Sequence, residues 1–113
     1  MTEEQAWEIH FQAEIDQAEK SRSEGNEGMA RVCARRAVGI VLGEYFRRNK
    51  IPINSPSAYD RLHFVEKLPG ISGDLLTMIQ HFLVRVSPDY RLPVAADLVA
   101  EAQQIKRTLL EKE

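Results

Sequence analysis

The 113-residue sequence has one cysteine, no long apolar run and almost no net charge. The single cysteine, Cys33, cannot form an internal disulfide, so the fold needs no oxidising compartment. The apolar runs are only a few residues long, far short of the roughly 20 that span a bilayer. Residues 1–4 read MTEE and precede no apolar block, so we expect no signal peptide. These absences predict one soluble, cytoplasmic domain over residues 1–113, because this length has room for one domain only.

The net charge of −2 conceals an uneven distribution of charge along the chain. Residues 1–30 carry a net −6, residues 31–50 a net +5, and residues 51–113 a net −1. The simpler interpretation is that the acidic and basic segments are neighbouring elements that attract each other. The alternative is that part of the basic segment faces a phosphate-bearing or acidic partner.

The spacing of apolar residues predicts helices and no strands. Gly and Pro residues separate periodic segments at about 3–24, 27–50, 57–68, 73–86 and 93–112, and no segment alternates with period two. Asn26 and Ser72 are suited to cap the second and fourth segments, and Pro93 to open the last. The second segment is apolar all round, as is typical of a central helix. We therefore predict an all-α, up-and-down four-helix bundle with an additional short helix, five helices in total.

Two features predict more apolar surface than a small bundle buries. The first helix carries one stripe of Ala6, Ile9 and Ala13 and another of Trp7, Phe11, Ile15 and Ala18, both at helical spacing. The second helix has two glycines four residues apart, which favour the close approach of another helix. A homodimer would cover this surplus, with a predicted interface at Trp7, Phe11, Ile15, Gly39 and Gly43. The alternative is that both stripes are buried within one chain.

The layout of the sequence resembles the HEPN family of small helical nucleotide-binding or RNA-cleaving domains. The resembling features are the acidic opening helix with Ala13, Ala18 and Glu19, the turn at 24–26, the alanine-rich run 30–39, the proline-containing loop and short helix over 52–68, and the loop 87–90 before the last helix. The resemblance covers nearly the whole chain and implies an all-helical bundle.

The resemblance also bears on catalysis. Members with an Arg, four to six residues and then a His are metal-independent endoribonucleases that act as dimers. Neither Arg85 nor Arg91 is followed by a histidine at that spacing, and His81 precedes Arg85. We therefore expect no catalytic residue, but a dimeric binding or regulatory module. The resemblance implies that it acts with a nucleotidyltransferase-like partner protein or with a nucleic-acid ligand. The alternative is a toxin-type endoribonuclease with a divergent active site.

The best candidate for a polar site combines arginines with a tyrosine. Arginine presents a planar fork to phosphate, and tyrosine can stack on a base. On these grounds the predicted contacts with a nucleotide or nucleic acid are Arg85, Tyr90 and Arg91. The resemblance to the family implies that Arg35 or Arg36 of the second helix lies near them. The alternative for Arg91 is that it stabilises its own loop beside Asp89.

The remaining reactive side chains do not form a motif. His10, His63 and His81 fall on three separate predicted helices without metal-ligand spacing, so we expect neither a metal nor a cofactor. Cys33 lies in an apolar run and is expected to be a small buried residue. His81 and Arg85 share a helical face, which is ordinary for bases at a helix C-terminus, although both could contact a phosphate.

Overall fold

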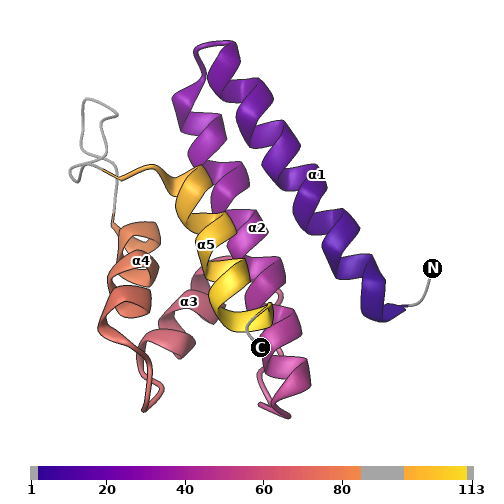
Figure 1. The fold of residues 1–113 in the computed structure, drawn as a ribbon, viewed down its shortest axis with the longest axis vertical. Helices are drawn as coiled ribbons and strands as arrows, with labels where there is room; N and C mark the ends of the chain where they lie inside the picture. The colour runs from indigo at the N-terminus through magenta and orange to yellow at the C-terminus, as the bar shows by residue number, and fades with distance from the viewer. Residues whose placement is uncertain (1–2, 85–95, 112–113) are drawn as a thin grey trace.

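The computed structural model describes residues 3–84 and 96–111, and side chains from residue 6 onward within them. It contains five helices and, within these ranges, no strand (Figure 1). The helices are α1 (Glu3–Ser23), α2 (Glu27–Arg48), α3 (Ala58–Glu66), α4 (Gly73–Leu83) and α5 (Leu98–Leu110). The all-α prediction is confirmed. None of the described helices combines the length and the apolar character that crossing a membrane requires.

The helix starts follow from side chains that cap the first turn. The Asn26 side chain accepts a hydrogen bond from the amide of Met29 at 3.0 Å, and Ser72 accepts one from Leu75 at 3.2 Å. Both caps were predicted, because short polar side chains satisfy amides that the helix leaves unbonded.

Two predicted helix ends are wrong. The last helix begins at Leu98, not at 93, because Asp97 accepts a hydrogen bond from the amide of Ala100 at 3.1 Å and caps the helix there. The fourth helix ends at Leu83, not at 86, since Val84 is already extended. Residues 85–95, which include Pro93, lie outside the described ranges.

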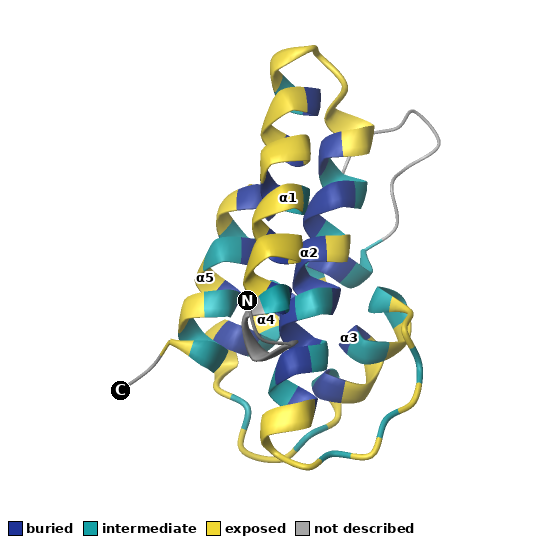
Figure 2. Ribbon diagram, turned by 90° about the vertical axis from the view of Figure 1, so that its right-hand side faces the viewer, coloured by how far each residue is buried: buried dark blue, intermediate teal, exposed yellow. Residues whose placement is uncertain are grey.

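Helix α2 is the centre of the bundle, as its all-round apolar sequence predicts. It packs against α1, α3 and α5, while α4 contacts α3 and α5 (Figures 1 and 2). Its fully buried residues include Cys33, Val38, Val41 and Leu42. They meet Phe11, Leu62, Ile79 and Ile105 from the other helices in one core.

The structure separates the two apolar stripes of α1. Trp7, Phe11 and Ile15 are buried in the core of a single chain, with 8%, 2% and 0% of their surface exposed. Ile9, on the other stripe, is 51% exposed, and the outer face of α1 is open along its length (Figure 2). The three residues predicted to form a dimer interface therefore pack within the chain, because the α1 face that carries them is the one turned toward the core.

The two glycines of α2 accommodate α3 of the same chain. A Cβ atom on Gly39 would lie 2.7 Å from the Cβ and 3.0 Å from the Cα of Ala58. A Cβ atom on Gly43 would lie 2.6 Å from Nη1 of Arg61, which donates a hydrogen bond to the carbonyl of Gly39 at 2.8 Å. The predicted close approach is present, but α3 occupies the surface that the sequence analysis assigned to a second copy.

Candidate functional site

An open groove lies beside the turn that joins α1 to α2. Its volume is about 520 Å³ and its lining comes from the turn and the first half of α2: Gly25, Asn26, Glu27, Gly28, Arg31, Val32 and Arg35. Gly25 has a φ of 80°, a left-handed conformation that glycine adopts without strain, and this reverses the chain. The turn thus forms one end of the groove and α2 forms its wall.

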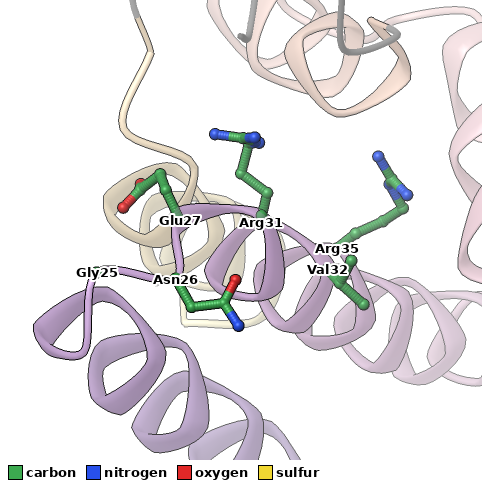
Figure 3. Close-up of a pocket in the computed structure, with 7 residues that line it drawn as sticks. Gly25, Asn26, Glu27, Arg31, Val32 and Arg35 are labelled. Carbon is green, nitrogen blue, oxygen red and sulfur yellow. The ribbon is translucent and has the colours of Figure 1, made fainter. Parts of the chain in front are cut away.

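Arg31 and Arg35 present two guanidinium groups on this wall. They are four residues apart, which is about one helical turn, so they leave α2 in the same direction (Figure 3). Val32 adds an apolar surface beside them. Two planar groups with several N–H donors on one side of a helix suit a phosphate or carboxylate ligand.

Arg35 also connects three helices. Its Nε donates a hydrogen bond to the carbonyl of Phe82 at 3.3 Å, at the end of α4. Its guanidinium carbon lies 5.9 Å from the centre of the Tyr59 ring on α3, within range of a cation–π contact. A positive charge at the C-terminal end of α4 is favourable, because the unbonded carbonyls there carry partial negative charge.

Arg22 holds the turn end of the groove in place. It forms ion pairs with Glu27 at 2.9 Å and with Asp97 at 3.1 Å. The hydrogen bond to Glu27 raises the pKa of Arg22. Burial raises the pKa of Asp97, but hydrogen bonds from the Ala100 amide and from Arg22 outweigh it and leave the pKa below its ordinary value. The turn, the groove and the start of α5 are therefore joined by one arginine.

The structure brings together only some of the predicted site residues. Arg35 lies in the groove, but Arg36 is exposed on another side of α2, where it borders a smaller hollow with Glu14 and Arg61. Consecutive helical residues point about 100° apart, and these two arginines accordingly line different hollows. Arg85, Tyr90 and Arg91 lie outside the described residues. Arg31 was not predicted as a site residue, although its spacing of four from Arg35 was a usable signal.

The histidines do not converge on one point. Nδ1 of His81 lies 2.8 and 3.0 Å from the two carboxylate oxygens of Glu101 and joins α4 to α5. His63 is on α3, 3.5 Å from Glu66, and His10 is exposed on α1. In the described parts of the chain, no three His, Cys, Asp or Glu side chains are grouped to hold a metal ion.

Cys33 is fully buried, as predicted. Burial raises the pKa of its thiol, and the neighbouring Glu14 raises it further. A raised pKa keeps the sulfur protonated and therefore unreactive. Cys33 acts as a small apolar residue of the core.

Comparisons of the chain with protein-family models, with curated proteins and with solved structures found no match.

Proposed function

We propose that this protein is a non-catalytic helical module that binds a phosphate-bearing ligand, such as a nucleotide, in the groove beside the α1–α2 turn. The observation that carries the proposal is the placement of Arg31 and Arg35 on one wall of that groove. Arginine forms short, charge-assisted hydrogen bonds with phosphate oxygens, which neutral side chains cannot match.

The size of the groove supports a ligand of nucleotide size. Small-molecule sites in proteins are usually about 300–1,000 Å³, and this groove has about 520 Å³. The apolar side of Val32 provides surface for a base. The resemblance to HEPN domains points in the same direction.

The module is further proposed to act as a homodimer and together with a nucleotidyltransferase-like partner protein, as the resemblance implies. Since Trp7, Phe11 and Ile15 are core residues, a second copy would have to use a face that remains exposed. The outer face of α1 is such a face (Figure 2), and it carries Ile9, which is half-exposed, in the N-terminal half of the helix.

The second candidate function is a metal-independent endoribonuclease with a divergent active site. Its residues would be Arg85, Tyr90 and Arg91, which follow α4 in the sequence. The observation that favours this candidate is the hydrogen bond from Arg35 to the carbonyl of Phe82, which joins a groove residue to the last turn of α4. In this case, purified protein cleaves total RNA without metal, and Arg85→Ala abolishes the cleavage. Intact RNA contradicts this second function.

Calorimetric titration tests the binding function. Wild-type protein is titrated with ATP, inorganic triphosphate and a short single-stranded RNA. We expect Arg31→Gln and Arg35→Gln each to weaken binding about ten- to hundredfold, the effect of losing a hydrogen bond between charged groups.

Arg36→Gln is the matched control, because it removes the same charge from another side of α2. It should leave the affinity within about twofold, since only long-range electrostatics change. Equal losses in all three variants would show that binding depends on net charge and not on the groove. Absence of binding to all three probes would overturn the proposal.

A further inference from the structure

We infer that Tyr59 on α3 and the last turn of α4 position Arg35 for its ligand, so that occupancy of the groove and docking of α4 are linked. This inference rests on the function proposed above. Tyr59 and the last turn of α4 do not line the groove, and the binding of phosphate by arginine does not by itself require them.

Two contacts hold the side chain of Arg35 in the absence of a ligand. Arginine has a long side chain whose rotational freedom is lost when it binds a ligand. Here the Phe82 carbonyl accepts a hydrogen bond from Nε at 3.3 Å, and the Tyr59 ring lies 5.9 Å from the guanidinium carbon. These two contacts, one to α4 and one to α3, define its orientation before any ligand arrives.

The contact with Phe82 involves only one of the three guanidinium nitrogens of Arg35. Within the described part of the chain, the bond from Nε is the one hydrogen bond that Arg35 makes. The two terminal nitrogens remain for an oxyanion, and their edge matches two oxygens of a phosphate. The contact with Phe82 therefore orients Arg35 without occupying the edge that binds phosphate.

Neighbouring residues hold both Tyr59 and the last turn of α4 in place. The Tyr59 ring packs edge to face on His63, with 4.8 Å between the ring centres. The last turn of α4 is joined to α5 by the His81–Glu101 contact at 2.8 Å, with both side chains about one-fifth exposed. Loosening either support frees Arg35, although neither His81 nor His63 lines the groove.

Ligand binding and the docking of α4 are then thermodynamically linked. If a docked α4 favours the oriented Arg35, a ligand that needs the oriented Arg35 favours the docked α4 to the same extent. A bound anion should therefore protect the last turn of α4 from local opening. Conversely, a substitution that weakens α4 docking should weaken anion binding.

The test uses inorganic triphosphate, because it has no base and therefore reports the contacts of the arginines with phosphate alone. Tyr59→Leu is expected to weaken triphosphate binding about two- to fivefold, as the loss of an exposed cation–π contact predicts. Tyr59→Phe keeps the ring and should bind as the wild type does.

The second readout is amide hydrogen exchange in the wild-type protein. Triphosphate is expected to slow exchange at Phe82 and Leu83, and His81→Gln is expected to weaken triphosphate binding. His10→Gln, on the exposed face of α1, is the matched control and should change nothing. If Tyr59→Leu does not fold, these two measurements decide.

The outcomes separate this inference from the proposed function. If triphosphate binds to the groove but Tyr59→Leu and His81→Gln bind it equally well, with no change in exchange at α4, the inference is wrong and the function stands. If the wild type binds none of the probes, the function fails and the inference with it.

Discussion

Arg22 donates a hydrogen bond from Nη1 to Oδ1 of Asp97 at 3.1 Å, across 75 positions of the sequence. The contact joins the last turn of α1 to the residue that caps α5, and Arg22 binds Glu27 of α2 at the same time. Three helices thus meet at one side chain, next to the groove. Both carboxylates are about half-exposed, so the ion pairs themselves contribute little stability; their effect is to fix where the turn lies.

The capping role of Asp97 predicts a loss of stability in Asp97→Ala. The expected cost is about 1 kcal/mol of unfolding free energy, because the Ala100 amide loses its acceptor. Asp97→Asn keeps a capping side chain and loses only the charge, so it should cost less. Urea denaturation measures both. Equal costs would show that the ion pair with Arg22, and not the cap, is responsible.

A buried carboxylate predicts how stability depends on pH. Glu44 is 7% exposed and accepts hydrogen bonds from Arg47 at 2.9 Å and Arg48 at 2.8 Å. The hydrogen bond from Arg47 holds the pKa of Glu44 below its ordinary value, although burial opposes it. A lowered folded pKa contributes stability that is complete above the unfolded pKa, about 4.3, and that disappears as the pH falls through the folded pKa.

Glu44→Gln should therefore be less stable than the wild type at neutral pH, by about 1 kcal/mol. The difference should shrink as the pH falls below the unfolded pKa, about 4.3, and through the lower folded pKa, because the wild-type carboxylate then becomes protonated. Thermal unfolding between pH 3 and pH 7 measures it. A constant difference over this range would mean that Glu44 stabilises α2 by packing and not by charge.

The close packing of α3 on α2 predicts that Gly39→Ala destabilises the protein. Alanine is normally favoured over glycine in a helix by about 1 kcal/mol. Here the added Cβ would lie 3.0 Å from the Cα of Ala58, so backbone must move and overpacking costs about 1–3 kcal/mol. Gly73→Ala, with nothing within 4 Å of its Cβ, is the control and should be neutral or stabilising. A stable Gly39→Ala would contradict the packing of α3.

The environment of the Trp7 side chain predicts that replacing it with phenylalanine costs little stability. Its Nε1 is buried without a hydrogen-bond partner in the described structure, while Arg48 and Lys106 lie 5.7 and 5.9 Å from its ring. Trp7→Phe removes the unpaired donor, worth about 1–3 kcal/mol, and this offsets the lost volume. Unfolding free energies should therefore agree within about 1 kcal/mol. Phe11→Ala, which only leaves a cavity, should cost about 3–5 kcal/mol.

Because Ile9 is exposed, it can be substituted to test the proposed homodimer without disturbing the core. Ile9→Asp should leave the fold intact, because the side chain is 51% exposed. If a second copy covers the outer face of α1, sedimentation should show a dimer for the wild type and a monomer for Ile9→Asp. Met29→Asp, at another exposed apolar position, is the control and should remain dimeric. A monomeric wild type would remove the dimer from the proposal.

Helix positions could be predicted from the sequence because they depend on local patterns. The apolar period marks α1 and α2 to within two residues, and Asn26 and Ser72 cap helices where short polar residues precede apolar ones. The start of α5 was mistaken because two local signals compete. Pro93 suits the first turn of a helix, but Asp97 is the residue that caps it.

The burial of the α1 stripes could not be predicted in this way. Both stripes have helical spacing, and periodicity alone does not say which one meets the core. The packing of α2 and α5 decides, with Trp7 and Phe11 inside and Ile9 outside. The glycines of α2 were likewise correctly expected to allow a close approach, but not to admit Ala58 of the same chain.

By itself, then, the sequence determined the helices, the central place of α2 and the buried character of Cys33, because each depends on residues close together in the chain. Only the tertiary structure decided that Arg35 lies in a groove while Arg36 lies outside it, and that His81 meets Glu101 and Arg22 meets Asp97. Those pairings join residues far apart in the sequence, and no local pattern determines which distant side chains the packing of helices will bring together.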